Sequence, residues 1–452
     1  MRDVGVEPYW ELTFDAEGDV DVRQRDRIAD GEVTDLLVFA HGWNNDRSIA
    51  SRLYRRFYRH FPDLVADRPG VRLGYVGVLW PSMRFTDEPI PDLEPVPRAA
   101  AATRGLDEDT RAALTGVFPG AEREAAVDRI AELLRDRPES TAALEEFGSL
   151  VRRLVADPAD SRAGGAAGAG GTDHGVEDPD GRAPGELAIL TADTVAVCRA
   201  FTEALAQAGA GAPGPAGPSG GAAPAIGFGG PGRWWDGAQE LLRQATYFTM
   251  KRRAGVVGER GLGPVLGRLG RVRPSVRVHL IGHSFGGRLV SYALRGLPEG
   301  TRSVKSLILL QGAFSHYAFA ARLPHAKDRS GALGGMHRRV DGPVVSCHSR
   351  HDTALGVLYP LASRAAGDSA GLLGLDSGRW GAIGHGGHRA VAGSVRLTLD
   401  EALAGGRLPA SGCVSVDAAK VVRRGGPPTG AHSDICHPEL ARVVLAAGRI
   451  GS

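Results

Sequence analysis

The segment that most constrains the fold is a glycine-rich turn, GHSFG, at residues 282–286. An apolar run typical of a buried strand, Val276–Ile281, leads into it, and a helical pattern from Arg288 to Arg295 follows it. A strand that turns directly into a helix is the usual connection in sheets whose parallel strands alternate with crossover helices. The turn therefore indicates an α/β protein.

Short apolar runs elsewhere in the chain repeat the same alternation with helical patterns. The other predicted strands are Leu36–Ala40, Val71–Trp80, Val304–Leu310, Pro343–Cys347 and Cys413–Val416. Helical patterns at 49–61 and 438–447 fit between or after them. Such runs are typical of strands buried on both faces of a parallel sheet. At one edge, Tyr9–Phe14 and its continuation to Val22 suggest an antiparallel hairpin.

Residues 84–235 interrupt this alternation. They contain helical patterns at 121–135, 141–155 and 187–208, divided by two tracts rich in Gly, Ala and Pro at 161–185 and 209–232. Such tracts bury too little apolar surface to offset the entropy of ordering. We expect a core of residues 1–83 and 236–452, with 84–235 as an insertion of helices on flexible linkers that could act as a lid.

The pair Trp234-Trp235 follows the second of these tracts. It could anchor an apolar substrate chain, but large aromatic side chains more often fill a core. We therefore interpret the pair as the return of the chain into the packed interior.

Ser284 is the predicted nucleophile. A serine on a sharp strand-to-helix turn has strained backbone geometry, and Gly282 and Gly286 remove Cβ atoms that would collide there. His283 occupies the variable position between them. The following helix directs its N-terminus at the reaction centre, where it favours negative charge. The alternative is a plain glycine-rich turn whose serine caps the helix.

A second loop suggests where an oxyanion could be stabilised. His41-Gly42-Trp43 follows the apolar strand Leu36–Ala40. Backbone N–H groups of Trp43 and Phe285 would form the oxyanion hole, each contributing about 2.7–4 kcal/mol. We assign the His41 side chain a structural role.

The acid that orients the base is expected to be Asp352, on the loop after the strand at 343–347. It could instead be the N-cap of the segment 353–361, and Asp376 is the fallback acid. The base is expected to be His432, which follows the last predicted strand. Its competitor, His437, directly precedes Pro438 and resembles a helix-start residue.

The remaining histidines and the cysteines do not indicate a metal or a disulfide. His348/His351 and His385/His388 are each spaced three residues apart, and the second pair lies in a flexible tract at 384–388 with no paired carboxylates or cysteines. We interpret all four as loop histidines near the site. No CxxC motif is present, and buried free thiols are expected. The cysteines are Cys198, Cys347, Cys413 and Cys436.

Composition excludes several classes of partner. The chain has 54 basic and 52 acidic residues, a net charge of +2, which gives no reason to expect nucleic acid or a membrane surface. The first ten residues lack the apolar core of a signal peptide. No apolar run approaches the roughly 18–20 residues that span a bilayer. A cytoplasmic protein is the expectation.

Together these residues resemble the α/β-hydrolase superfamily, in particular its serine esterase and lipase branch. The matching positions are the HG turn at 41–42, the elbow at 282–286, Asp352 and His432, and the resemblance covers residues 30–82 and 236–450. It implies an α/β-hydrolase fold with a mostly parallel sheet of about eight strands flanked by helices. It also implies acyl transfer through a serine ester without a cofactor.

Two hypotheses of function follow. In the first, the protein is a serine hydrolase that cleaves a small-molecule carboxylic ester, or a thioester, through an acyl-enzyme on Ser284. In the second, it keeps the hydrolase scaffold but serves as a binding or regulatory protein through the insertion at 84–235. The sequence leaves the acyl group, the alcohol group and the oligomeric state open.

Overall fold

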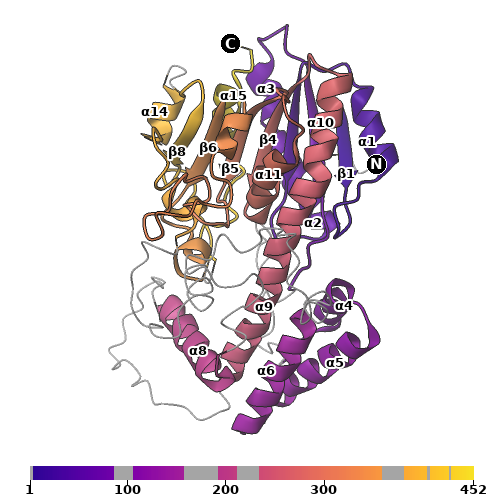
Figure 1. The fold of residues 1–452 in the computed structure, drawn as a ribbon, viewed down its shortest axis with the longest axis vertical. Coiled ribbons are helices and arrows are strands. Elements are labelled where there is room, and N and C mark those ends of the chain that lie inside the picture. Colours follow the sequence, from indigo (N-terminus) through magenta and orange to yellow (C-terminus); the bar gives the residue numbers. More distant parts are fainter. Residues whose placement is uncertain are drawn as a thin grey trace, which may run out of the picture.

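A single eight-stranded sheet forms the centre of the protein (Figure 1). The structure is a computed structural model that describes residues 4–85, 105–156, 192–210, 234–358, 381–404, 408–426 and 429–451. The strand order is β1-β3-β2-β4-β5-β6-β8-β7, and all seven neighbouring pairs are parallel. The strands are β1 (Tyr9–Thr13), β2 (Asp35–Ala40), β3 (Leu73–Leu79), β4 (Arg277–His283), β5 (Val304–Leu310), β6 (Pro343–His348), β7 (Val395–Thr398) and β8 (Gly412–Asp417). The expectation of an α/β protein with a parallel sheet is confirmed.

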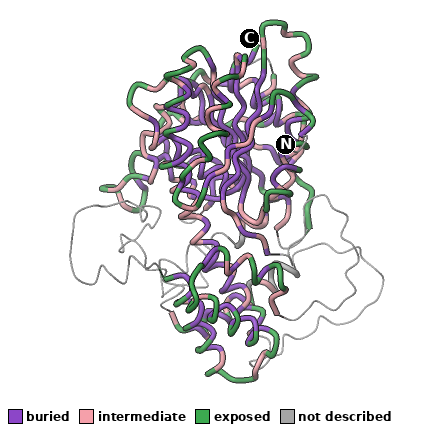
Figure 2. The backbone as a smooth tube through the Cα atoms, turned by 90° about the vertical axis from the view of Figure 1, so that its right-hand side faces the viewer, coloured by how far each residue is buried: buried purple, intermediate pink, exposed green. Residues whose placement is uncertain are grey.

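Helices cover both faces of the sheet, and the strands are buried between them (Figure 2). Within β2, Leu36 and Val38 pack into one apolar cluster, whereas Leu37 and Phe39 pack into the other. The first cluster contains side chains of α1 (Val22–Ala29), α9 (Trp234–Val256), α10 (Gly263–Val272) and α11 (Phe285–Gly296). The second contains side chains of α2 (Arg47–Tyr58), α3 (Phe61–Val65), α14 (Leu399–Leu403) and α15 (Pro438–Gly448).

The strand order reverses its direction next to β2. From β2 the chain moves to β3 on one side, and the next strand, β4, returns to pair with the other side of β2. In an open parallel sheet, the crevice at the carboxyl ends of the strands beside such a reversal is the usual ligand site. The last pair of this register, Ala40 and Gly282, leads directly into the loop at 41–43 and the turn at Ser284.

The insertion supplies a group of helices at one end of the molecule (Figure 1). They are α4 (Glu108–Val117), α5 (Ala121–Asp136), α6 (Thr141–Val155) and α8 (Thr194–Ala210). The helices expected at 121–135 and 141–155 are confirmed; the start of the third, and both glycine-rich tracts, lie outside the described residues. Helix α9 runs from this group to the sheet and continues through η2 (Val257–Leu262) into α10.

The predicted antiparallel hairpin at the N-terminal edge is wrong. β1 pairs in parallel with β3, and Val22 begins helix α1 instead of ending a strand. The carboxylate of Asp21 caps that helix by accepting the N–H groups of Arg23 and Gln24. One antiparallel bridge, Phe14 to Val20, is what remains of the hairpin. The cap at Asp21 starts a helix at the point where the sequence pattern predicted the second strand of the hairpin.

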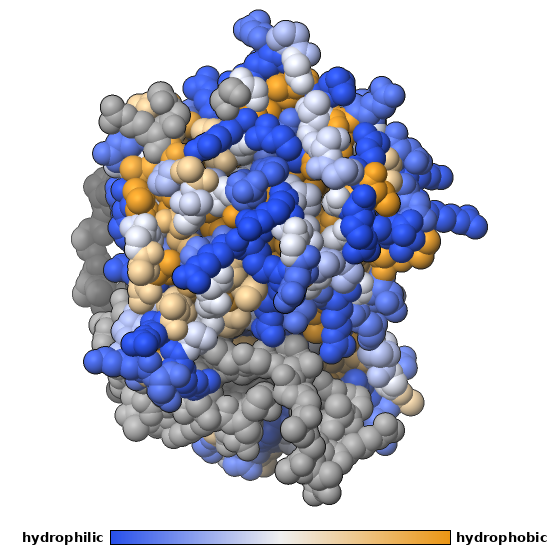
Figure 3. All heavy atoms as spheres, turned by 45° about the horizontal axis from the view of Figure 1, so that its top comes forward, coloured by the Kyte–Doolittle hydropathy of each residue, from blue (hydrophilic) through white to orange (hydrophobic). Residues whose placement is uncertain are grey.

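No helix in the described part of the chain combines the length and apolarity needed to cross a bilayer. Hydrophilic residues cover much of the face shown in Figure 3, with apolar areas scattered between them.

Trp235 lies in the apolar core, as expected for a residue at the return of the chain. It is 0% exposed, packs edge-to-face on Phe147 at 5.7 Å, and donates its indole N–H to the Pro138 carbonyl at 3.0 Å. Trp234 is half-buried, with the Arg199 guanidinium 5.5 Å from its ring. The two neighbouring tryptophans therefore differ sharply in packing.

We expect Trp235→Ala to lower the free energy of unfolding by about 3–5 kcal/mol, because a large buried side chain is replaced by a cavity. Trp234→Ala is the matched control and costs about 1 kcal/mol or less, the value of an exposed cation–π contact. Urea unfolding followed by circular dichroism measures both. Equal losses for the two variants would contradict the packing described.

Candidate active site

The backbone at Ser284 is held in a strained conformation by its glycine neighbours. Ser284 has φ 55° and ψ −121°, a region that residues other than glycine rarely adopt. A Cβ at Gly282 would lie 2.4 Å from the Gly286 carbonyl oxygen, and one at Gly286 would lie 2.0 Å from the Ala40 carbonyl oxygen. No side chain fits at either position, so the turn requires both glycines.

The Ser284 hydroxyl does not cap the helix that follows. Ser284 occupies the N-cap position of α11, yet its side chain makes no capping hydrogen bond. Its Oγ instead lies 2.9 Å from Nε2 of His432. The capping interpretation of this serine is therefore not supported, and the hydroxyl is directed at an imidazole.

His432 is held between the serine and a buried carboxylate. Its Nδ1 lies 2.8 Å from Oδ2 of Asp352, which is 0% exposed. A carboxylate oxygen accepts a hydrogen bond, which assigns the proton to Nδ1 and leaves the lone pair of Nε2 facing Ser284. This is the tautomer that a general base for the hydroxyl requires.

Asp352 makes hydrogen bonds of both kinds considered for it, to an imidazole and to a backbone N–H. One oxygen, Oδ2, accepts from His432, and the other, Oδ1, accepts the N–H of Leu355 at 3.0 Å, as an N-cap does. The side-chain amide of Gln311 lies 3.3 Å from Oδ2 and donates a third hydrogen bond. A carboxylate that is fully buried needs such partners, because its burial would otherwise be very costly.

The loop after β2 lies against Ser284. A Cβ at Gly42 would come within 2.7 Å of Cβ of Ser284. The side-chain amide of Asn45 donates to the carbonyls of Gly42 and Trp43, and the indole N–H of Trp80 donates to the His41 carbonyl at 2.9 Å. These bonds fix the loop that carries the backbone N–H of Trp43.

The side chain of His41 is structural, as expected. It is buried, its Nδ1 bonds the carbonyl of Gly42 at 2.8 Å, and its ring stacks on Trp80. Burial lowers the pKa of His41 to about 4, so the ring is neutral at physiological pH.

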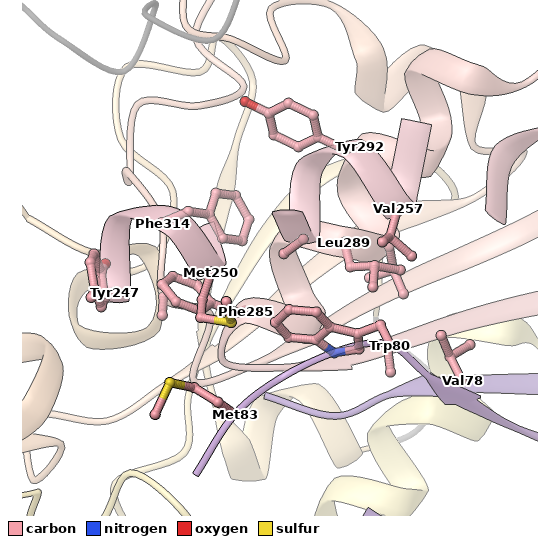
Figure 4. Close-up of a cluster of buried hydrophobic side chains, with 14 of the residues drawn as sticks. Val78, Trp80, Met83, Tyr247, Met250, Val257, Phe285, Leu289, Tyr292 and Phe314 are labelled. Atoms are coloured by element: carbon pink, nitrogen blue, oxygen red, sulfur yellow. The ribbon is translucent and has the colours of Figure 1, made fainter. Parts of the chain in front are cut away.

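An aromatic cluster joins this loop to helix α9. Trp43 contacts the rings of Phe85, Tyr247 and Phe285, and Tyr247 also lies 4.7 Å from Phe285. Figure 4 shows Tyr247 and Met250 of α9 together with Phe285 at the start of α11. The two residues whose N–H groups we assign to an oxyanion hole thus share one packed environment.

His437, the alternative base, is bonded to a carboxylate other than Asp352. His437 bonds Asp434 at 2.8 Å and precedes α15 as its N-cap residue, as its sequence position indicates. Asp376 lies outside the described residues. The described residues contain no group of three or more side chains suited to hold a metal ion, including those around His348, His351, His385 and His388. Cys198, Cys347 and Cys413 are buried free thiols, and Cys436 is free and partly buried.

Sequence reasoning missed one residue of the site and one contact within it. Gln311, which donates to Asp352, is 0% exposed and has φ 48°. A polar residue directly after the apolar strand β5 is the signal that could have indicated it. The missed contact is made by His283, which the sequence places in the elbow: its ring lies 2.9 Å from the His432 carbonyl oxygen. No sequence pattern reveals that contact, because its acceptor is a backbone atom far along the chain.

Compared with protein-family models, with curated proteins and with solved structures, the chain finds no match.

Four buried histidines make stability depend on pH. Burial lowers the pKa values of His41 and His348 to about 4 and those of His283 and His388 to about 3. In the unfolded chain these histidines bind a proton near pH 6.5, whereas in the folded protein their side chains stay neutral at that pH. The stability that they contribute is therefore complete above about pH 6.5 and is lost as the pH falls toward 4. The pKa of Asp35 is also lowered, from its ordinary value of 3.8. Its contribution to stability therefore changes only below about pH 3.8, outside this pH range.

We expect the free energy of unfolding to fall by roughly 1 kcal/mol per pH unit for each of these histidines as the pH decreases below about 6.5. Urea unfolding at a series of pH values between about 7 and 5 measures the slope. His388→Leu removes one of these groups and should reduce the slope by roughly 1 kcal/mol per pH unit. A stability that is constant over this range would contradict the buried neutral histidines.

Proposed function

We propose that this protein is a serine hydrolase that cleaves a carboxylic ester, with a thioester as the second choice of bond. The observation that carries the proposal is the continuous line of hydrogen bonds from the Ser284 hydroxyl through His432 to the buried Asp352, at 2.9 and 2.8 Å. Three side chains that are distant in sequence meet at the carboxyl edge of the sheet in the order that nucleophilic catalysis requires.

In the proposed mechanism, Nε2 of His432 takes the hydroxyl proton as Ser284 Oγ attacks the acyl carbonyl carbon. The resulting tetrahedral oxyanion is stabilised by the N–H groups of Phe285 and Trp43, and the N-terminus of α11 favours the same negative charge. Asp352 stabilises the imidazolium, which then protonates the leaving alcohol. Water, deprotonated by His432, attacks the ester on Ser284; collapse of the second intermediate releases the acid and restores the hydroxyl.

Several features support an α/β-hydrolase fold as part of this proposal. The nucleophile lies on a strained strand-to-helix turn, the loop after β2 lies beside it, and the acid and base follow it in that order along the chain. The sheet has the proposed number of strands, and all its described pairs are parallel. The insertion separates β3 from β4.

The second hypothesis, a binding or regulatory protein acting through residues 84–235, is motivated by glycine-rich tracts that lie outside the described residues. No contact in the described helices favours it over catalysis. The strained turn at Ser284 favours catalysis, since such strain persists where function depends on it.

We expect a fluorophosphonate probe to label the native protein at Ser284, because His432 activates its hydroxyl. Ser284→Ala should abolish labelling and the hydrolysis of p-nitrophenyl esters. Ser291→Ala is the matched control. This serine lies in α11, the helix that follows Ser284, where it is 0% exposed and donates to the Gly287 carbonyl. Because Ser291 is not the labelled residue, labelling should continue in this variant. Absence of labelling in the native protein, or labelling that survives Ser284→Ala, would overturn the proposal.

The close contact between Gly42 and Ser284 gives a second test. Gly42→Ala should lower kcat/KM on p-nitrophenyl esters by about 100-fold, because the added methyl displaces the nucleophile or the oxyanion loop by about an ångström. Gly70→Ala is the control, since a Cβ there meets nothing within 4 Å and should leave the rate unchanged. Unchanged hydrolysis by folded Gly42→Ala would contradict the proposed site.

A further inference from the structure

His283 is a buried histidine that the proposed mechanism does not use. It is the last residue of β4 and precedes the nucleophile, and its side chain is almost fully enclosed, with the residue 4% exposed. Its Nε2 lies 2.9 Å from the carbonyl oxygen of His432. The two imidazole rings lie 5.1 Å apart at an angle of 44°. The residue before the nucleophile thus contacts the backbone of the base.

The chemistry of this contact fixes the state of the His283 ring. A carbonyl oxygen can only accept, so Nε2 must carry the proton and donate it. Burial lowers the pKa of His283 to about 3, and the neighbouring imidazoles of His432 and His41 act in the same direction. The ring is therefore neutral and keeps a single N–H. Its other nitrogen, Nδ1, faces Gly42, where a Cβ would approach it to 3.2 Å.

We propose that His283 is a positioning residue that holds the backbone of the base, His432, at a fixed position relative to the nucleophile, Ser284. This inference rests on the proposed hydrolase function. The peptide bond connects His283 to Ser284, and one hydrogen bond connects its ring to His432, so a short rigid link joins the two reacting residues. It acts at a different point from Asp352, which orients the imidazole ring through Nδ1.

The hydrogen bonds around His432 show why this link matters. The neighbouring backbone is held by the N–H of Ala431, which donates to the His351 carbonyl, and by the N–H of Asp434, which donates to the Ala431 carbonyl. The carbonyl of His432 itself is held by His283. Loss of that bond frees the peptide that carries the imidazole, and a displacement of about 1 Å at a reacting group can cost about 100-fold in rate.

The test compares His283→Leu with His283→Gln. Leucine fills the space without a donor, whereas the glutamine amide can place an N–H near the position of Nε2. We expect His283→Leu to lower kcat for p-nitrophenyl esters, and the rate of fluorophosphonate labelling, by about 10- to 100-fold while KM changes little. His283→Gln should recover most of both rates. A residue with a purely structural role would show the same kcat in both folded variants.

His279→Leu is the matched control. His279 lies on the same strand, is 0% exposed and bonds Asp35 and Ser306, but it is at the opposite end of β4 from the nucleophile. This variant should be destabilised without losing kcat in its folded fraction. Equal losses of kcat in His279→Leu and His283→Leu would overturn the inference, because general loosening of the strand would then explain both.

A readout independent of activity separates this inference from the proposed function. The proton on Nδ1 of His432, bonded to Asp352, should give a downfield proton NMR signal, assigned by its loss in His432→Gln. We expect this signal to broaden in His283→Leu and to persist in His283→Gln. A sharp, unshifted signal in His283→Leu would overturn the inference even if no ester is hydrolysed. If the hydrolase proposal itself is wrong, the fluorophosphonate probe will not label the native protein.

Discussion

The site depends on the close approach of the end of β2 to the start of α11. The backbone at Gly286 lies so near the Ala40 carbonyl that no Cβ fits between them. Because Ala40, the last residue of β2, pairs with Gly282, the residue before the last of β4, the two strands end within one residue of each other. This contact places the loop at 41–43 beside the hydroxyl of Ser284 and sets the distance between the two groups that would stabilise an oxyanion. Larger residues at this junction would move Ser284 away from the loop at 41–43.

Burial gives the site its electrostatic character. Asp352 is fully enclosed and receives hydrogen bonds from His432, Gln311 and the Leu355 N–H. Low polarity around a carboxylate strengthens each of these bonds, but it also makes every missing partner costly. The surrounding histidines His41 and His283 are kept neutral by the same burial. The cost of burying the Asp352 carboxylate is therefore offset by its hydrogen-bond donors, including the imidazole of His432. The neutral rings of His41 and His283 add no positive charge beside it.

Much of this arrangement could be predicted from sequence because it depends on local patterns. The apolar runs identified β2, β3, β4, β5, β6 and β8, and the glycine spacing identified the strained turn. β7 was missed because it has four residues and alternates between half-buried and exposed positions. The hairpin after β1 was wrong because the cap at Asp21 begins a helix there.

The contacts that support the site could not be predicted in the same way. Gln311 and His283 bond atoms that are remote in sequence, and one of those acceptors is a main-chain carbonyl with no residue signature. Ser284, Asp352 and His432 were each chosen by position at a strand end, and the structure brings them within hydrogen-bonding distance. Positions at strand ends follow from the order of elements, whereas their supporting partners depend on side-chain packing in three dimensions.

Helix α9 connects the insertion to the residues beside Ser284. Its 23 residues form a rod of about 35 Å, with Trp235 fixed in the insertion at one end and Tyr247 and Met250 beside the elbow further along. Tyr247 contacts both Trp43 and Phe285. A sliding or tilting of this rod would therefore move Trp43 and Phe285 together, which links the position of the distal helices to the geometry around Ser284.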